Sequence, residues 1–340
     1  MQSELKRSKQ YFRSVGLVHE LGLKQEECDI KVRDKDGNDA GTKKGERILG
    51  NVVLKTDNGL HTFNVYFQNL DFRGEPSKNW KMAQAMMNWN PSVNGTGEPA
   101  TLVALEGTVS VNDYVNPSTG ILYTNLRWRV SKATTKVDEN EHHGTGLKAT
   151  CYVAKIAPEI RNEEETGRLV VTLMAGNNDG TCFPIECIVT EDLADDFNDV
   201  IEVGTTVPFD FDRTTRHVGE TKGGRKVLGR ASQTNVNTGY DIDELILAGA
   251  DEPVEKPEEL EDEDGNPIED KSGWIDPVAM KKAIKVRNQM LEEMKKNPNP
   301  AKRPAGFKEQ KANMEKKAKK SVGKVREDFD GEDDDNESPF

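Results

Sequence analysis

The chain has 340 residues, enough for two domains at about 150 residues each. Hydrophobic residues make up 34% of it and charged residues 31%, and the mean hydropathy is −0.76, so part of the chain is not expected to pack into a core. The sequence has no apolar signal region and no apolar run of membrane-spanning length. We therefore expect a cytoplasmic protein whose four cysteines are reduced thiols.

The net charge of −13 is unevenly distributed. Residues 1–250 have a net charge of −7 and residues 251–270 of −10. Residues 271–326 carry 17 basic and 5 acidic residues, whereas 327–340 carry 8 acidic and no basic residues. Local charge rather than the total decides which surface meets a polyanion. The negative total therefore does not exclude a nucleic-acid partner.

The N-terminal residues 1–27 are expected to form a helix, or an arm, packed on the first domain. Their apolar residues have partly helical spacing, and Ser3 is suited to cap a helix. The composition of 34–39 predicts a turn that loosely resembles a calcium loop but lacks its closing glutamate. We therefore interpret 34–39 as a hairpin tip and not as a metal site.

Alternation of apolar and polar residues predicts strands after this turn. In the segment 60–68, for example, Phe63, Val65 and Phe67 share one face. The first group of expected strands is 28–33, 47–55, 60–68, 101–112 and 121–131, with an expected helix at 76–89. Strand, strand, strand, helix, strand, strand is the order of the OB-fold, a small five-stranded Greek-key barrel. The sequence therefore predicts a first OB-fold module over 28–135.

The same order of elements recurs in the second half, although the halves share no obvious residue identity. A polar linker, 132–146, leads into it. The expected strands are 147–156, 168–175, 181–189, 206–212 and 225–236, with an expected helix at 191–200. The predicted fold class is mainly β: tandem OB-folds, the second over 147–250.

Three segments of different charge follow the second module. Residues 251–272 form an acidic, proline-containing linker. Residues 273–326 form a basic helical segment, whose helix opens with Asp276 as N-cap and Pro277 as first residue. Apolar residues at helical spacing form a stripe along one side of this helix: Met280, Ala283, Ile284, Leu291 and Met294. Residues 327–340 form an acidic tail, which repels itself and is expected to be disordered.

The first module carries the residues expected to bind a single-stranded nucleic acid, which proteins hold on aromatic platforms in a positively charged groove. In the strand 121–131, alternation places Trp128 on the core side with Leu122, Leu126 and Val130. The outward residues are Tyr123, Arg127 and Arg129, together with Tyr66 on its own strand and Tyr114 at a hairpin tip. A single exposed tyrosine or arginine is most often ordinary surface, so the prediction of nucleic-acid binding depends on these five residues together.

The second module concentrates basic residues in the hairpin before its last expected strand. They are Arg213, Arg216, Lys222, Arg225, Lys226 and Arg230. This hairpin is one of the two OB-fold loops that commonly grip oligonucleotides. We favour nucleic-acid binding there over a merely solvated hairpin, because the rest of the module is acidic.

The sequence shows no signal of an enzyme. It contains no phosphate-binding loop, no GxSxG and no HExxH motif. Cys182 and Cys187 are an odd number of residues apart on an expected strand, so they point to opposite faces and cannot share a metal. His142 and His143 lie in a linker without a matching cysteine pair. We therefore predict no catalytic residues, no metal and no cofactor.

The end of the chain combines a run of acids with a terminal aromatic residue. Asp333, Asp334 and Asp335 precede a final Pro339 and Phe340. A partner can capture such a peptide by burying the ring in a pocket and pairing the α-carboxylate with a basic residue. The stretch resembles the C-terminal tail of single-stranded-DNA-binding proteins of bacteria and phages.

That resemblance implies a function and partners. It implies a protein that binds single-stranded DNA with little sequence preference during replication, recombination or repair. Its tail, through Asp333, Asp334, Asp335, Pro339 and Phe340, would recruit a polymerase, helicase, primase or nuclease. A phage-encoded version would act in the host cytoplasm. The familiar bacterial version has one OB-fold and forms tetramers, so two modules in one chain leave the oligomeric state open.

Two other classes of function remain open on the sequence. The chain is a replisome or virion scaffold if its OB-like modules bind protein. In that case the helix 276–296 would dock on a partner through its apolar stripe. A third alternative is an enzyme subunit whose catalytic chain lies elsewhere.

Overall fold

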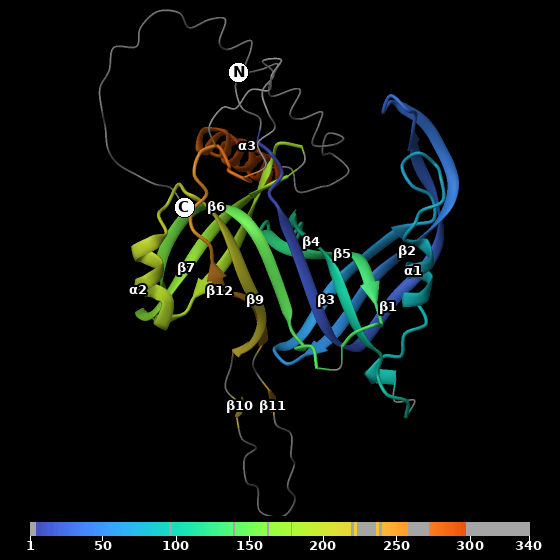
Figure 1. The fold of residues 1–340 in the computed structure, drawn as a ribbon, viewed down its shortest axis with the longest axis horizontal. Helices are drawn as coiled ribbons and strands as arrows, with labels where there is room; N and C mark the ends of the chain where they lie inside the picture. The colour runs from blue at the N-terminus through green and yellow to red at the C-terminus, as the bar shows by residue number, and fades with distance from the viewer. Residues whose placement is uncertain are drawn as a thin grey trace, which may run out of the picture.

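The computed structural model describes residues 5–94, 97–138, 140–161, 163–177, 179–218, 221–222, 236–237, 240–257 and 272–296. These residues form two small β-barrels that meet along one pair of strands, with a helix lying over the second barrel (Figure 1). The fold is mainly β, as the alternation in the sequence predicts.

Five strands close the first barrel. They are β1 (Gln10–Arg33), β2 (Asp39–Thr56), β3 (Gly59–Gln68), β4 (Leu102–Val115) and β5 (Leu122–Thr134). Their order is β2-β3-β5-β4-β1, and a β1–β2 pairing closes the ring. The β3–β5 pairing is parallel and the others are antiparallel. Helix α1 (Trp80–Met86) lies between β3 and β4 in sequence, followed by the short 3-10 turn η1 (Ser92–Asn94). This is the predicted OB-fold.

The second barrel repeats this topology. Its strands are β6 (Thr145–Arg161), β7 (Glu164–Gly176), β8 (Cys182–Val189), β9 (Thr206–Val218) and β12 (Tyr240–Ala250). Helix α2 (Glu191–Val200) lies between β8 and β9 in sequence. The β8–β12 pairing is the parallel one, and β6–β9 closes the ring. Two short strands, β10 (Thr221–Lys222) and β11 (Val236–Asn237), form a separate ribbon between β9 and β12.

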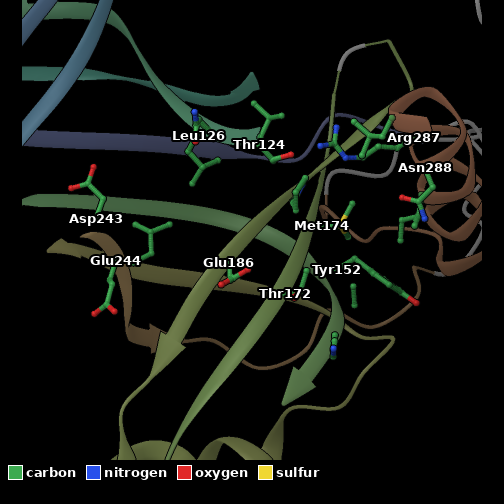
Figure 2. A pocket seen from close by; sticks show the side chains of 18 of the residues that line it. Thr124, Leu126, Tyr152, Thr172, Met174, Glu186, Asp243, Glu244, Arg287 and Asn288 are labelled. Carbon is green, nitrogen blue, oxygen red and sulfur yellow. The ribbon is translucent and has the colours of Figure 1, made fainter. Parts of the chain in front are cut away.

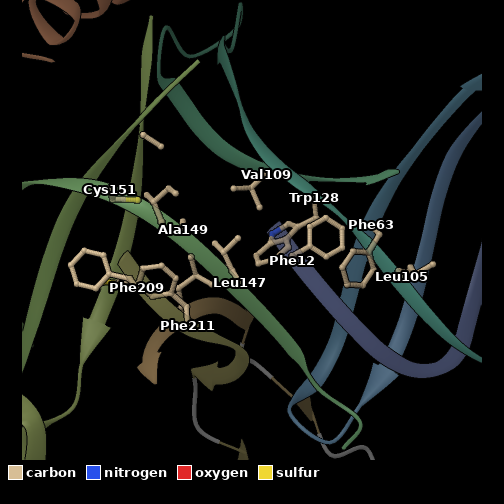
Figure 3. Packing of buried hydrophobic residues seen from close by; sticks show 14 of the residues in the cluster. Phe12, Phe63, Leu105, Val109, Trp128, Leu147, Ala149, Cys151, Phe209 and Phe211 are labelled. Carbon is tan, nitrogen blue, oxygen red and sulfur yellow. The ribbon is translucent and has the colours of Figure 1, made fainter. Parts of the chain in front are cut away.

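A seam of backbone hydrogen bonds joins the barrels, because the start of β1 pairs with the start of β6, from Gln10↔Ala149 to Ser14↔Thr145. The apolar core runs through this seam as one cluster (Figure 3). In the first barrel Phe12 stacks on Phe63 at 5.5 Å between ring centroids. Leu147 of β6 belongs to the same buried cluster. The linker expected over 132–146 therefore ends at the seam, where β6 begins at Thr145.

The expected N-terminal helix or arm is wrong, because most of these residues form strand β1 of the first barrel. Phe12, Leu21 and Leu23 pack on the core cluster. Glycines within the strand disfavour a helix. At Gly16 an added Cβ would lie 2.7 Å from the carbonyl oxygen of Lys55, so β1 needs glycine where it approaches β2.

The end of the second barrel also differs from the expected order. The predicted strand 225–236 lies almost wholly outside the described residues. The strand that completes the barrel is β12, a segment for which no strand was expected. Its many carboxylates obscure the buried positions Leu245 and Leu247.

Helix α3 (Pro277–Lys296) begins where its cap signals predict. Met280 and Ala283 are buried in a small cluster with Tyr152, Met174 and Cys182 of the second barrel. The first part of the apolar stripe, Met280, Ala283 and Ile284, therefore packs on the chain's own barrel.

Candidate nucleic-acid interface

The outer wall of the first barrel carries the predicted module-1 residues. Trp128 is buried in the core, as the alternation predicts, and Arg127 and Arg129 on either side of it are exposed. The three outward tyrosines are partly exposed: Tyr66 by 37%, Tyr114 by 39% and Tyr123 by 37%. Strand pairing thus brings one surface together from β3, β4 and β5. We call it the outer wall.

Two of these residues meet across strands. Asn64 of β3 pairs with Arg129 of β5 in the parallel ladder. The guanidinium carbon of Arg129 lies 5.6 Å from the centroid of the Tyr66 ring. Beside them, Asn64 donates a hydrogen bond of 2.8 Å to the side chain of Asn51 on β2. A ring, a guanidinium and two amides therefore lie side by side, which suits the stacking of a base and the binding of a phosphate.

The tip of the β4–β5 hairpin carries a second aromatic feature. Tyr114 and Tyr123 face each other in the ladder, and their rings stack at 5.2 Å with an interplanar angle of 16°. The hairpin is held from its other side, where Asp113 accepts hydrogen bonds of 2.7 Å from both Thr124 and Arg287. Arg287 belongs to α3, so the helix anchors the hairpin that presents the two rings.

The charge of the outer wall is not neutralised locally. Within the described residues, Arg127 and Arg129 have no ion-pair partner. On the neighbouring strand β1 the situation differs, because Arg13 pairs with Glu106 at 2.6 Å and with Glu141 at 2.7 Å. From Tyr123 to Arg129 the outer wall extends about 20 Å along β5.

Arg213 corrects one prediction of the sequence analysis. It lies in β9 rather than in a loop, and it is only 4% exposed. Its guanidinium donates to the Thr62 carbonyl at 3.2 Å, pairs with Asp243 at 2.5 Å and lies 4.7 Å from the centroid of the Trp128 ring. Burial lowers its pKa. Arg213 is thus a contact between the barrels and is not placed to meet a phosphate.

The structure locates only part of the remaining predicted set. Arg216 lies in β9 and Lys222 in β10. Outside the described residues lie Arg225, Lys226, Arg230, Asp333, Asp334, Asp335, Pro339 and Phe340. The basic hairpin and the acidic tail therefore stay predictions.

A cavity of about 1060 Å³ lies between the barrels under α3 (Figure 2). Residues from β4, β5, the strands of the second barrel and the helix line it. Its charges are mixed, with basic Lys155, Arg213, Lys281 and Arg287 and acidic Glu186, Asp243 and Glu244. Arg213 and Arg287 are held in ion pairs with Asp243 and Asp113, so these two guanidinium groups are not available to a polyanion. Together, the cavity and α3 occupy the outer face of β6, β7 and β8.

A family model described as YorF matches residues 24–297. The chain belongs to the YorF family. The YorF match extends from within β1 to just beyond α3, so it includes both barrels and the helix.

Two solved structures resemble this YorF family chain. Wild-type single-stranded DNA binding protein from Thermus aquaticus has 8% identity and a TM-score of 0.39, covering 75% of this chain and 97% of its own. A deletion mutant of the same protein has 9% identity and a TM-score of 0.39, covering 74% and 98%. No curated protein sequence matches the chain.

Other kinds of site find little support in the described part of the chain. There, no three histidine, cysteine or acidic side chains gather as metal ligands would. No helix in the same ranges is long and apolar enough to cross a membrane. The four cysteines are unpaired, and Cys182 and Cys187 point to different clusters, as their spacing predicts.

Proposed function

We propose that the protein binds single-stranded DNA with little sequence preference and without catalysing a reaction. The supporting observation is the outer wall, where exposed tyrosines share one surface with two arginines that no described carboxylate neutralises. Bases stack on Tyr66 and on the Tyr114–Tyr123 pair, while Arg127 and Arg129 contact phosphates. Stacking tolerates any base because every base has a π-face.

The wall suits a single strand better than a duplex. Its aromatic rings offer faces for unstacked bases, which a duplex keeps inside its own stack. The phosphate contacts make binding depend on salt, because each neutralised phosphate releases counterions.

The test is a binding titration of the full chain with labelled oligo-dT and with duplex DNA, at about 50 and 200 mM salt. We expect a strong preference for the single strand and a marked loss of affinity at the higher salt. Equal affinity for the duplex, or no binding to either probe, would contradict the proposal.

We further propose that the tail, residues 327–340, recruits partner proteins of replication, recombination or repair through Phe340. In the absence of DNA its carboxylates compete for the basic surfaces of the chain, and the basic segment 273–326 either holds the tail or adds a phosphate contact. The strong segregation of charge between these two segments supports the idea.

Deleting residues 327–340 tests the tail. The truncated chain is expected to bind oligo-dT more tightly than the full chain at low salt and to lose partner capture. At high salt the full and the truncated chain should bind oligo-dT with the same affinity, because screening removes the competition from the tail. A truncation that changes neither the affinity nor partner capture rules out this role.

A further inference from the structure

A second groove lies at the seam between the barrels. It has a volume of about 690 Å³ and is lined by residues of both barrels and of the segment just before β1. The basic residues that line it are Arg7, Lys9 and Lys148, and the acidic ones are Asp210 and Asp251. Tyr11 lines it too and is 42% exposed. We call this the seam groove.

The seam groove is connected to the outer wall through consecutive strands. Tyr11 of β1 faces Lys148 of β6 in the ladder across the seam. Thr108 of β4 lines the groove with Tyr11 and is paired with Arg129 of β5. Arg129 in turn contacts the Tyr66 ring on β3. The row from β6 to β3 crosses five strands, a distance of about 19 Å at the usual spacing between strands.

The members of this row point away from the core. Phe12, next to Tyr11, is fully buried, and Gly107 beside Thr108 and Val130 beside Arg129 are buried as well. Successive residues of a strand point to opposite faces, so Tyr11, Thr108 and Arg129 share the outer surface. The row is therefore continuous with the outer wall and has an aromatic ring near each end.

The seam groove is lined by more basic than acidic side chains. Lys148 pairs with Asp210 at 2.7 Å, and this contact raises the pKa of the lysine. Both partners are exposed, so the pair is weak and can be exchanged for a phosphate. Arg7 and Lys9 are also exposed. Three cations face two carboxylates, which leaves a site for a polyanion.

We propose that the seam groove is a second subsite for the single strand bound on the outer wall, and that one DNA path crosses from the first barrel to the second. This inference rests on the proposed function. Tyr11 stacks a base, and Arg7, Lys9 and Lys148 contact the phosphates that follow. The second barrel thus takes part through its seam edge, although its own outer face is covered.

The test compares two lengths of oligo-dT on the full chain. A probe of about 8 nucleotides suits one OB-fold, and a probe of about 25 exceeds the 16 that one OB-fold covers. The double variant Arg7→Ala/Lys9→Ala is expected to bind the long probe about tenfold more weakly. The salt slope, which is the steepness with which the logarithm of the binding constant falls with the logarithm of the salt concentration, should decrease by about 1.4 because two phosphate contacts are lost. It should bind the short probe like the wild type. Tyr11→Leu should weaken the long probe without changing the salt slope.

The matched control is Lys78→Ala/Lys81→Ala, which removes two exposed charges near α1, far from the groove in sequence and on another element. It should change the affinity for either probe by less than about twofold. Thermal melting checks that each variant is folded.

Two results distinguish a failure of the seam-groove proposal from a failure of the proposed function. If the wild type binds oligo-dT but Arg7→Ala/Lys9→Ala binds the long probe unchanged, the seam groove is overturned and the proposed function stands. If the wild type binds neither probe, the proposed function fails and the subsite fails with it.

Discussion

The two barrels have the same topology but present their equivalent faces differently. In the first barrel the outer surface of β2, β3 and β5 is open and carries Tyr66 and Arg129. In the second barrel the corresponding strands β7, β8 and β12 contribute Met174, Glu186 and Glu244 to the cavity under α3 (Figure 2). The same fold therefore gives one open face and one covered face, and the covering helix, not the barrel, makes the difference.

Helix α3 is attached to both barrels. Met280 is fully buried against Tyr152 and Met174, which fixes the helix to the second barrel. Arg287 pairs with Asp113 of the first barrel at 2.7 Å, with side chains only 12% and 14% exposed. Removing one partner of such a pair leaves a poorly solvated charge, so the helix also stabilises the arrangement of the β4–β5 hairpin.

Two arginines on the surface of the second barrel are held in ion pairs with carboxylates. Glu159 and Glu244 lie between Arg161 and Arg168, with ion-pair distances from 2.5 to 3.6 Å. Glu159 is buried, and although desolvation raises its pKa, the hydrogen bonds from Thr166 and Arg161 and the charge of Arg168 hold that pKa below the usual value. Arg161 and Arg168 are therefore neutralised by carboxylates, unlike Arg127 and Arg129 on the outer wall of the first barrel.

The largest expected effect comes from uncovering the second barrel. Met280→Asp places a carboxylate in the buried cluster and should detach α3 at a cost of about 3 kcal/mol or more. The thiol of Cys182 lies in the same cluster, and burial raises its pKa to about 12. Detachment should make Cys182 react with a maleimide, as detected by mass spectrometry of the labelled peptide.

The control for this change is Lys285→Asp, on an exposed position of the same helix. It should leave Cys182 protected. Cys151 and Cys187 lie in the main core and should stay unreactive in both variants. Equal protection of Cys182 in Met280→Asp and in the wild type would show that the helix does not depend on this contact.

The next effect concerns the junction that keeps the two barrels together. His61 is fully buried, with Nδ1 2.7 Å from the Thr145 hydroxyl and, within the described residues, no partner for Nε2. Burial, with a further contribution from the charge of Arg213, lowers its pKa to about 4 from an ordinary 6.5. The unfolded state therefore binds the proton more readily between these two values.

Stability should consequently fall as the pH drops from 6.5 towards 4, by about 3 kcal/mol from this group alone. Urea unfolding at several pH values measures the loss. His61→Gln, which does not titrate, should show a smaller decrease over the same range. The idea fails if both proteins lose stability in parallel.

The smallest expected effect compares the charges of the two faces directly. Arg127→Ala/Arg129→Ala on the open face should weaken oligo-dT binding by about 1.4 kcal/mol, or tenfold, and reduce the salt slope by about 1.4. Lys155→Ala/Lys281→Ala, in the cavity beside the covered face, should change it by less than about 0.5 kcal/mol. Similar losses from both pairs would mean that the second face also binds DNA.

The sequence by itself determined the order of elements from β2 to β9 and the side on which strand residues lie. Alternation places Trp128 in the core and Arg127 and Arg129 outside, and the structure agrees. Hairpin composition and cap signals likewise locate the 34–39 turn and the start of α3. These features depend on neighbours within a few residues, so periodicity and local composition carry the information.

The tertiary structure alone decided which surfaces stay open. Arg213 belongs to a basic stretch in the sequence, yet it is buried against Trp128 of the other barrel. The apolar stripe of α3 is equally suited to a partner or to the chain itself, and the burial of Met280 against Tyr152 and Met174 shows that its first part packs on the chain itself. The seam groove combines residues near Arg7 with Lys148. No local pattern reports such contacts, because they depend on how distant segments pack.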